Sequence, residues 1–209
     1  MTSDVEIISS GIRARLEHSD INVPVLTKEY FDELLGTPVL YYQVSEGEFK
    51  MVNPRSACEL SLENDKVEIK DLSGKAPNKK SKSLDIIYQF IGHLSYPIKS
   101  YCFTYEFIFK GDKTLRPDEW IASKLIKKTE IKEQLGNDIS STEVILRFQR
   151  DNVFWNIKFG GYDSQKGDSI RVRFHIHTDA VQLPVKETLA IEFTSAFAEA
   201  LKYIESFNK

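Results

Sequence analysis

The sequence predicts an α+β protein made of two successive halves, each with the order strand, helix, three or four antiparallel strands, helix. Short segments alternate between apolar and polar side chains, which is typical of half-buried strands. Turn residues separate these segments and indicate hairpins. An amphipathic helical stripe closes each half, and we expect these helices to pack on one face of the sheet. The boundaries are 1–96 and 97–209, and we expect the halves to form one pseudo-symmetric unit.

The first half begins with a strand over 5–17, in which apolar residues alternate with Arg13 and Arg15. A short helix follows, with Thr27 as its N-cap and Gly36 as its stop. Four short strands are expected next, over 39–44, 49–52, 57–62 and 66–72, with turns at Glu46-Gly47, Asn53-Pro54 and Asn64-Asp65. A lysine-rich loop, 74–83, leads into a helix that ends before Pro97.

The second half begins with a strand over 99–109 that carries aromatic side chains on one face. Pro117 opens a helix, and a second short helix is expected from Thr129 to Gly136. Three strands follow, over 143–149, 153–159 and 170–177, the first two joined by a tight turn at Asp151-Asn152. Gly160-Gly161 and 163–168 are predicted to form a loop, and a long helix follows Pro184.

This duplicated layout resembles the TATA-binding-protein-like or helix-grip topology. The resemblance is one of element order and covers most of the chain, although the second half is one strand short. No DNA-contacting motif of that family is matched. The resemblance therefore implies an architecture, an antiparallel sheet with helices on one face, and fold alone does not assign a function.

Composition limits the classes of function. The 209 residues carry a formal net charge of -3, which argues against a protein dedicated to nonspecific duplex binding. The N-terminal residues lack the apolar core of a signal peptide, and no segment reaches the ~20 apolar residues of a membrane span. Cys58 and Cys102 have no metal-ligand spacing and are expected to be reduced thiols, with a single disulfide between them as the alternative. A cytoplasmic protein without a membrane partner is expected.

One face of the second-half sheet gathers basic side chains. Strand alternation places the following residues there: Arg147, Gln149, Asn156, Lys158, Arg171, Arg173, His175 and His177. Glu106 and Glu143 offset this charge in part, and Arg13 and Arg15 hold the equivalent place in the first half. The functional interpretation is a site for phosphate, a nucleotide or a nucleic-acid backbone. The alternative is an ordinary solvated sheet face.

His175 and His177 form a His-x-His motif, which points both rings to one side of a strand, ~6.5–7 Å apart at the backbone. Two such rings suit two ligands of one metal, and a catalytic zinc needs a third, for which Asp179 and Glu106 are candidates. The alternative is two surface histidines beside two arginines. The sequence identifies no cofactor, because it contains neither a phosphate-binding glycine loop nor a nucleophile elbow.

The leading hypothesis is therefore a non-enzymatic binding or interaction protein that recognises an anionic ligand or nucleic acid through Arg147, Lys158, Arg171, Arg173, His175 and His177. The first alternative is a metal-dependent enzyme that uses the His-x-His motif. The second is a structural or assembly subunit, bound through exposed aromatics such as Phe154, and a homo-oligomer is compatible with it.

Overall fold

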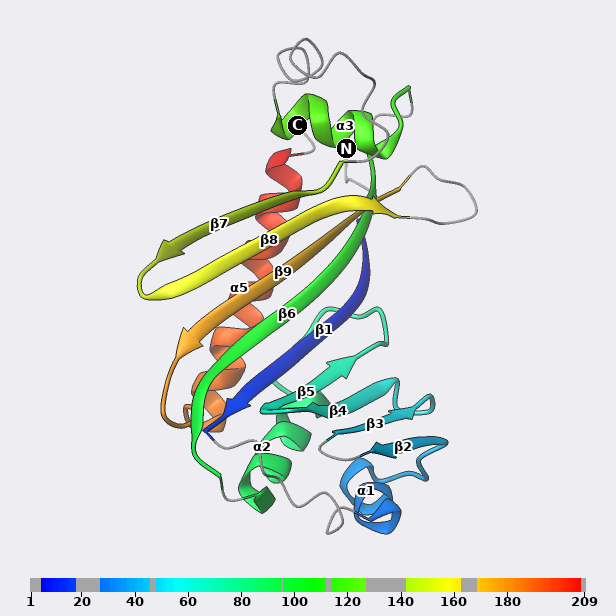
Figure 1. The fold of residues 1–209 in the computed structure, drawn as a ribbon, viewed down its shortest axis with the longest axis vertical. Helices are drawn as coiled ribbons and strands as arrows, with labels where there is room; N and C mark the ends of the chain where they lie inside the picture. Colours follow the sequence, from blue (N-terminus) through cyan, green and yellow to red (C-terminus); the bar gives the residue numbers. More distant parts are fainter. Residues whose placement is uncertain are drawn as a thin grey trace.

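The computed structural model describes residues 5–17, 27–45, 48–94, 96–111, 114–126, 142–162 and 169–207 (Figure 1). The described strands form one nine-stranded sheet in which all neighbours are antiparallel, in the order β2-β3-β4-β5-β1-β6-β9-β8-β7. The strands are β1 (Val5–Leu16), β2 (Tyr41–Ser45), β3 (Glu48–Asn53), β4 (Cys58–Glu63), β5 (Lys66–Asp71), β6 (Ile98–Lys110), β7 (Val144–Arg150), β8 (Val153–Tyr162) and β9 (Ser169–Asp179).

Two central strands join the first part of the chain to the second. β1 pairs with β5 on one side and with β6 on the other, and β6 pairs in turn with β9. The sequence left open whether the strands of the two halves share a sheet. The structure shows one continuous sheet, with the first-half strands below β6 in Figure 1 and the second-half strands above it.

The described helices begin close to the residues that local sequence signals predict. They are α1 (Lys28–Leu35), α2 (Lys82–Leu94), α3 (Pro117–Leu125) and α5 (Lys186–Phe207). The Thr27 hydroxyl accepts a hydrogen bond from the Tyr30 N–H at 3.2 Å, which caps α1 as predicted. Gly36 ends α1 in the left-handed conformation with φ 67°.

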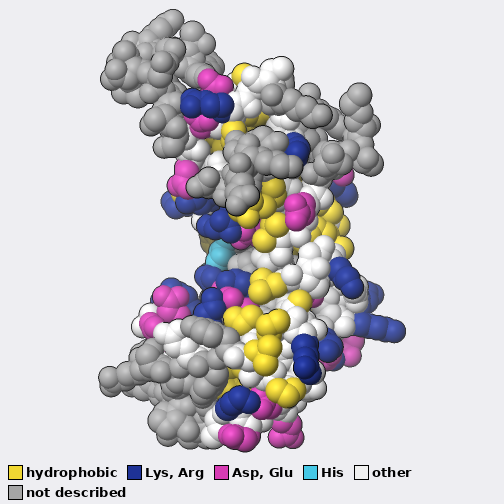
Figure 2. Space-filling view, turned by 90° about the vertical axis from the view of Figure 1, so that its right-hand side faces the viewer, with side chains coloured by type: hydrophobic (Ala, Val, Ile, Leu, Met, Phe, Trp, Pro, Cys, Tyr) yellow, Lys and Arg dark blue, Asp and Glu magenta, His cyan; other side chains and the backbone are white. Residues whose placement is uncertain are grey.

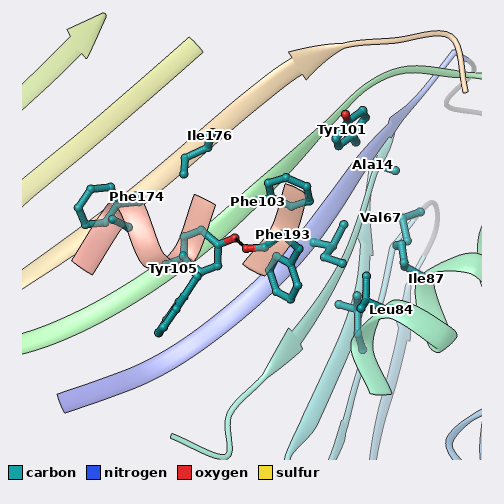
Figure 3. Packing of buried hydrophobic residues seen from close by; sticks show 14 of the residues in the cluster. Ala14, Val67, Leu84, Ile87, Tyr101, Phe103, Tyr105, Phe174, Ile176 and Phe193 are labelled. Atoms are coloured by element: carbon teal, nitrogen blue, oxygen red, sulfur yellow. Dashed lines mark hydrogen bonds between the residues drawn. The ribbon is translucent and has the colours of Figure 1, made fainter. Parts of the chain in front are cut away.

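The core lies between the sheet and the helices, which are on one side of it; α5 crosses behind β6, β9 and β8 in Figure 1. Tyr105 and Phe103 of β6 point to Phe193 of α5, with ring centroids 5.5 and 5.3 Å from it (Figure 3). The Tyr105 hydroxyl donates a hydrogen bond to the Phe193 carbonyl, so this large ring is buried without losing its polar contact. Large aromatic rings therefore fix α5 on the sheet.

One predicted loop is wrong. Gly160 and Gly161 belong to β8, which continues to Tyr162, because β9 begins at Ser169 and supplies Arg171 and Ile170 as pairing partners for the two glycines. The turn predicted at Glu46-Gly47, the short helix predicted from Thr129 to Gly136 and the predicted loop 163–168 lie outside the described residues. Among the helices that the structure describes, none combines the length and apolar character needed to cross a membrane.

Candidate functional site on the open face of the sheet

The sheet face opposite the helices, here called the open face, carries polar side chains because alternate residues of each strand point to it. On β9 these are Arg171, Arg173, His175 and His177, while their neighbours Val172, Phe174 and Ile176 are buried. The open face faces the viewer in Figure 1 and forms the left-hand edge of Figure 2. That edge is hollowed at mid-height, where Lys, Arg and His side chains gather.

The hollow contains a groove of about 590 Å³, here called the central groove. It runs across strands of both halves, β5 and β1 on one side and β6, β9 and β8 on the other. Its polar lining residues are Ser9, Arg13, Glu68, Lys70, Thr104, Glu106, Asn156, Lys158, Arg171, Arg173 and His175.

Positive charge predominates in the central groove. Five lining side chains are cationic, whereas two, Glu68 and Glu106, are carboxylates, so the formal excess is three positive charges. Burial, together with the nearby charges of Arg13 and His177, lowers the pKa of His175 to about 4, so its imidazole is neutral at pH 7. The whole chain carries a net charge of -3, so the groove is opposite in sign to the protein.

Glu106 holds two arginines of the central groove. Arg173 Nε lies 3.3 Å from Glu106 Oε2, and Arg171 forms an ion pair with Oε1 of the same carboxylate. The register explains this arrangement, since Glu106 is paired with Arg173 across β6 and β9. One carboxylate between two guanidinium groups leaves a net positive charge, and both arginine side chains remain partly exposed, at 34% and 48%.

The other carboxylate, Glu68, joins three strands. Its oxygens accept from Arg13 at 2.9 Å and from the Thr104 hydroxyl at 3.2 Å, and Lys70 Nζ lies 3.4 Å away. Burial acts to raise the pKa of Glu68, but the charges of Arg13 and Lys70 with the hydrogen bonds outweigh it, and the net shift is downward. The carboxylate is thus ionised and links β5 to β1 and, across β1, to β6.

A cysteine lies beneath these charges. Cys102 is 3% exposed, and its Sγ lies 3.9 Å from His175 Nδ1. Burial raises the pKa of the Cys102 thiol to about 12, so the pair consists of a protonated thiol and a neutral imidazole. That is the opposite of an activated nucleophile, which needs a thiolate. Cys58 and Cys102 are both free thiols.

The predicted binding residues divide into two groups. Lys158, Arg171, Arg173 and His175 line the central groove. Arg147 and His177 are not among its lining residues, although the strand register places them on the open face: Arg147 lies on the outermost strand, β7, opposite Asn156, and His177 lies one step along β9 from His175.

The two histidines of the His-x-His motif have different neighbours. His175 contacts Cys102, whereas His177 Nε2 lies 2.8 Å from Asp179 Oδ1. Glu106, the other candidate ligand, is paired with the two arginines. In the described part of the chain, no three His, Cys, Asp or Glu side chains are grouped so as to hold a metal ion. Metal binding by this motif stays a prediction.

Sequence reasoning missed the contribution of β5. Glu68 and Lys70 alternate with the buried Val67 and Ile69, so the sequence pattern already placed them on a polar face. What it lacked was the pairing of β5 with β1, which brings these charges to the central groove. Arg13 lies there as well, whereas Arg15 is paired with Asp65 and does not line the groove.

A second groove of about 380 Å³ shares Arg13, Glu68 and Lys70 with the central groove and extends over the first-half strands. Its balance of charge is reversed, because four carboxylates, including Glu59 and Glu63, face three cations. The excess of positive charge on the open face is thus a property of the central groove and its second-half strands.

No protein-family model matches the chain, and no curated protein sequence matches it significantly.

Proposed function

We propose that this chain is a binding protein that holds an anionic ligand in the central groove. The observation that carries the proposal is the excess of three positive charges in a groove on a protein whose net charge is -3. Clustered cations in a concave surface raise the local concentration of anions and steer them to it. The volume of about 590 Å³ is in the range of small-molecule sites.

Arg171 and Arg173 are the principal residues of this proposal. Guanidinium groups suit phosphate and carboxylate oxygens, because their donors form a planar fork. Both already share Glu106, so an arriving anion exchanges part of that ion pair for its own contacts. Lys158 adds a third cation, paired with the exposed Glu143 at 2.9 Å. Phosphate, a nucleotide and a nucleic-acid backbone all present suitable oxygens.

A repeated architecture supports a site that spans both halves. We propose that residues 1–96 and 97–209 are two versions of one β-α-β(3-4)-α unit in a pseudo-symmetric arrangement of the TATA-binding-protein-like or helix-grip kind. The support is that the first strands of the units, β1 and β6, lie side by side, and that the last strand of each, β5 and β9, pairs with the first. A cytoplasmic location accords with the two free thiols.

Charge reversal tests the binding proposal. With inorganic pyrophosphate as the probe in isothermal titration calorimetry, Arg171→Glu with Arg173→Glu should abolish binding. Because this variant places two new carboxylates beside Glu106, a second variant, Arg171→Gln with Arg173→Gln and Glu106→Gln, removes the same cations without like-charge repulsion. Circular dichroism should show that at least one of them is folded.

The matched control is Lys79→Glu with Lys80→Glu. These exposed residues of the lysine-rich loop lie outside the central groove, and their reversal changes the net charge by the same amount. Pyrophosphate affinity should fall less than threefold in this control. Unchanged affinity for pyrophosphate in a folded variant of Arg171 and Arg173 would contradict the proposal.

The nucleic-acid version makes a separate prediction. Binding of single-stranded DNA or RNA should fall steeply as salt is raised from 50 to 200 mM, because phosphate contacts release counterions. Absence of any mobility shift at low salt would rule this version out and leave a small anion as the ligand.

The two alternative functions stay predictions. A metal-dependent enzyme would retain stoichiometric metal on His175 and His177, and elemental analysis of the native protein tests this. An assembly subunit would form a stable oligomer or co-purify with a partner through exposed apolar residues such as Phe154, which is 42% exposed.

A further inference from the structure

On the open face, β8 and β9 present an ordered change of side-chain chemistry. The register pairs three residues of β8 with three of β9: Phe154 with His177, Asn156 with His175, and Lys158 with Arg173. The steps are an aromatic pair, a hydrogen-bonding pair and a cationic pair, here called the β8–β9 ladder. Successive steps on one face of a strand are ~6.5–7 Å apart.

The aromatic step is exposed. Phe154 is 42% exposed on a face whose other side chains are mostly polar, and its ring centroid lies 6.0 Å from that of His177. A large apolar ring that the fold does not bury offers a flat surface on which another ring can stack. No packing requirement of the core accounts for Phe154, because its side chain points away from the core.

The middle step has an unused hydrogen-bond acceptor. Asn156 Oδ1 is buried in the lining of the central groove, and no residue that the structure describes donates a hydrogen bond to it. Buried polar atoms of this kind are uncommon in folded proteins, because an unmade hydrogen bond is costly. A ligand that lies over the middle step would relieve this cost by donating to Oδ1, once a rotation of the terminal amide turns this covered atom toward the groove.

The cationic step extends the ladder toward the best site for an anion. Lys158 and Arg173 lie side by side, and Arg171 follows one step further, opposite Gly160. The absence of a side chain at Gly160 leaves space beside Arg171, and a smaller hollow of about 100 Å³ is present there. Anionic oxygens at this end would be one step from Asn156 and two steps from Phe154.

We propose that the β8–β9 ladder binds a nucleotide unit, with its base stacked on Phe154, a hydrogen bond from the ligand to Asn156 Oδ1, and its phosphate on the long side chains of Lys158 and Arg173. This inference rests on the proposed anion-binding function and names the class of anion. A nucleotide has a flat heteroaromatic base, hydrogen-bond donors and a phosphate in that order. Protein sheets that bind single strands stack bases on aromatic side chains in the same way.

The test compares three probes by isothermal titration calorimetry with the full chain: inorganic pyrophosphate, adenosine 5′-monophosphate and a single-stranded oligoadenylate. Phe154→Ala should weaken binding of adenosine 5′-monophosphate about 5- to 150-fold, the range that loss of one stacked base produces. Pyrophosphate has no base, so its affinity should stay within twofold. The matched control is Ile145→Ala, which removes an equally exposed apolar side chain (46%) from β7 on the same face and should change neither affinity.

The outcomes distinguish anion binding by the central groove from nucleotide binding by the β8–β9 ladder. If pyrophosphate binds as tightly as the nucleotide and Phe154→Ala changes neither, the inference is overturned while anion binding stands. If no probe binds, both fail. If Phe154→Ala weakens binding of the adenine-containing probes, the ladder is supported. Tighter, strongly salt-dependent binding of the oligoadenylate would then identify the nucleotide unit as part of a strand, and equal binding of the mononucleotide would identify it as a free nucleotide.

Discussion

His175 combines burial with nearby positive charge, which makes it sensitive to pH. Burial, with Arg13 and His177 next, lowers its pKa from 6.5 to about 4 in the folded protein. The unfolded chain therefore takes up a proton near pH 6.5, whereas the folded chain does so near pH 4. Between these values the unfolded state binds more protons, so this residue makes stability fall as pH falls from 6.5 to 4.

His175→Gln should remove this component. Between pH 7 and pH 4.5 the free energy of unfolding of the wild type should fall by about 2 kcal/mol more than that of the variant. Urea denaturation at the two pH values measures it. A difference between wild type and variant that is the same at both values would contradict the account, because it would mean that His175 is protonated equally in both states.

At the residue scale, the sequence predicted which side chains lie on the open face, but not which residues they contact there. Strand alternation was enough to place Arg171 and Arg173 on one face. It also predicted that Glu106 offsets part of their charge, but not that this one carboxylate pairs with both arginines, since that depends on the register between β6 and β9. For the same reason the unused acceptor of Asn156 has no signature in the sequence.

Among the elements, β1 is the most confined, because it lies between β5 and β6. A Cβ on Gly11 would lie 2.6 Å from Thr104 Oγ1 and 2.9 Å from the Ile69 carbonyl oxygen. The carbonyl belongs to the backbone and cannot move without disturbing the sheet. The absence of a side chain at Gly11 therefore permits the close approach of Thr104, which donates to Glu68.

Gly11→Ala should lower the free energy of unfolding by about 1–3 kcal/mol through overpacking. The matched control is Gly92→Ala in α2, where a Cβ meets nothing within 4 Å. There the same added methyl group should raise stability by about 0.5–1 kcal/mol, because alanine favours the helix. Urea midpoints of the two variants measure both effects, and equal midpoints would show that the space around Gly11 is not restrictive.

Local signals predicted the elements where one or two residues decide the backbone. Asp151 and Asn152 have φ values of 49° and 61°, as the predicted tight turn between β7 and β8 requires. The loop predicted at Gly160-Gly161 is wrong, although glycine favours turns locally. The long partner strand β9 extends the strand pairing through both residues.

For the whole molecule, one sheet and one core join the two halves. The buried cluster contains residues of both, such as Ile12 and Val67 of the first and Phe103 and Phe193 of the second. The sequence predicted the layout of each half but not their union, since nothing local specifies that β1 pairs with β6. Long-range pairing of two central strands is a property of the complete chain.

This shared core predicts a single unfolding transition. Fluorescence of Trp120 and Trp155, both buried in the second half, should follow the same urea curve as far-UV circular dichroism, which reports on both halves. Two separate transitions would show that 1–96 and 97–209 unfold as independent domains.

The central claim is that the central groove binds an anion, and titration of ¹⁵N-labelled protein with inorganic pyrophosphate tests it most directly. The account predicts that amide shifts change with a common affinity along β6, β8 and β9, above all at Lys158, Arg171 and Arg173. Saturable changes confined to the lysine-rich loop, or no change at millimolar pyrophosphate, would contradict the claim and leave the open face as an ordinary solvated surface.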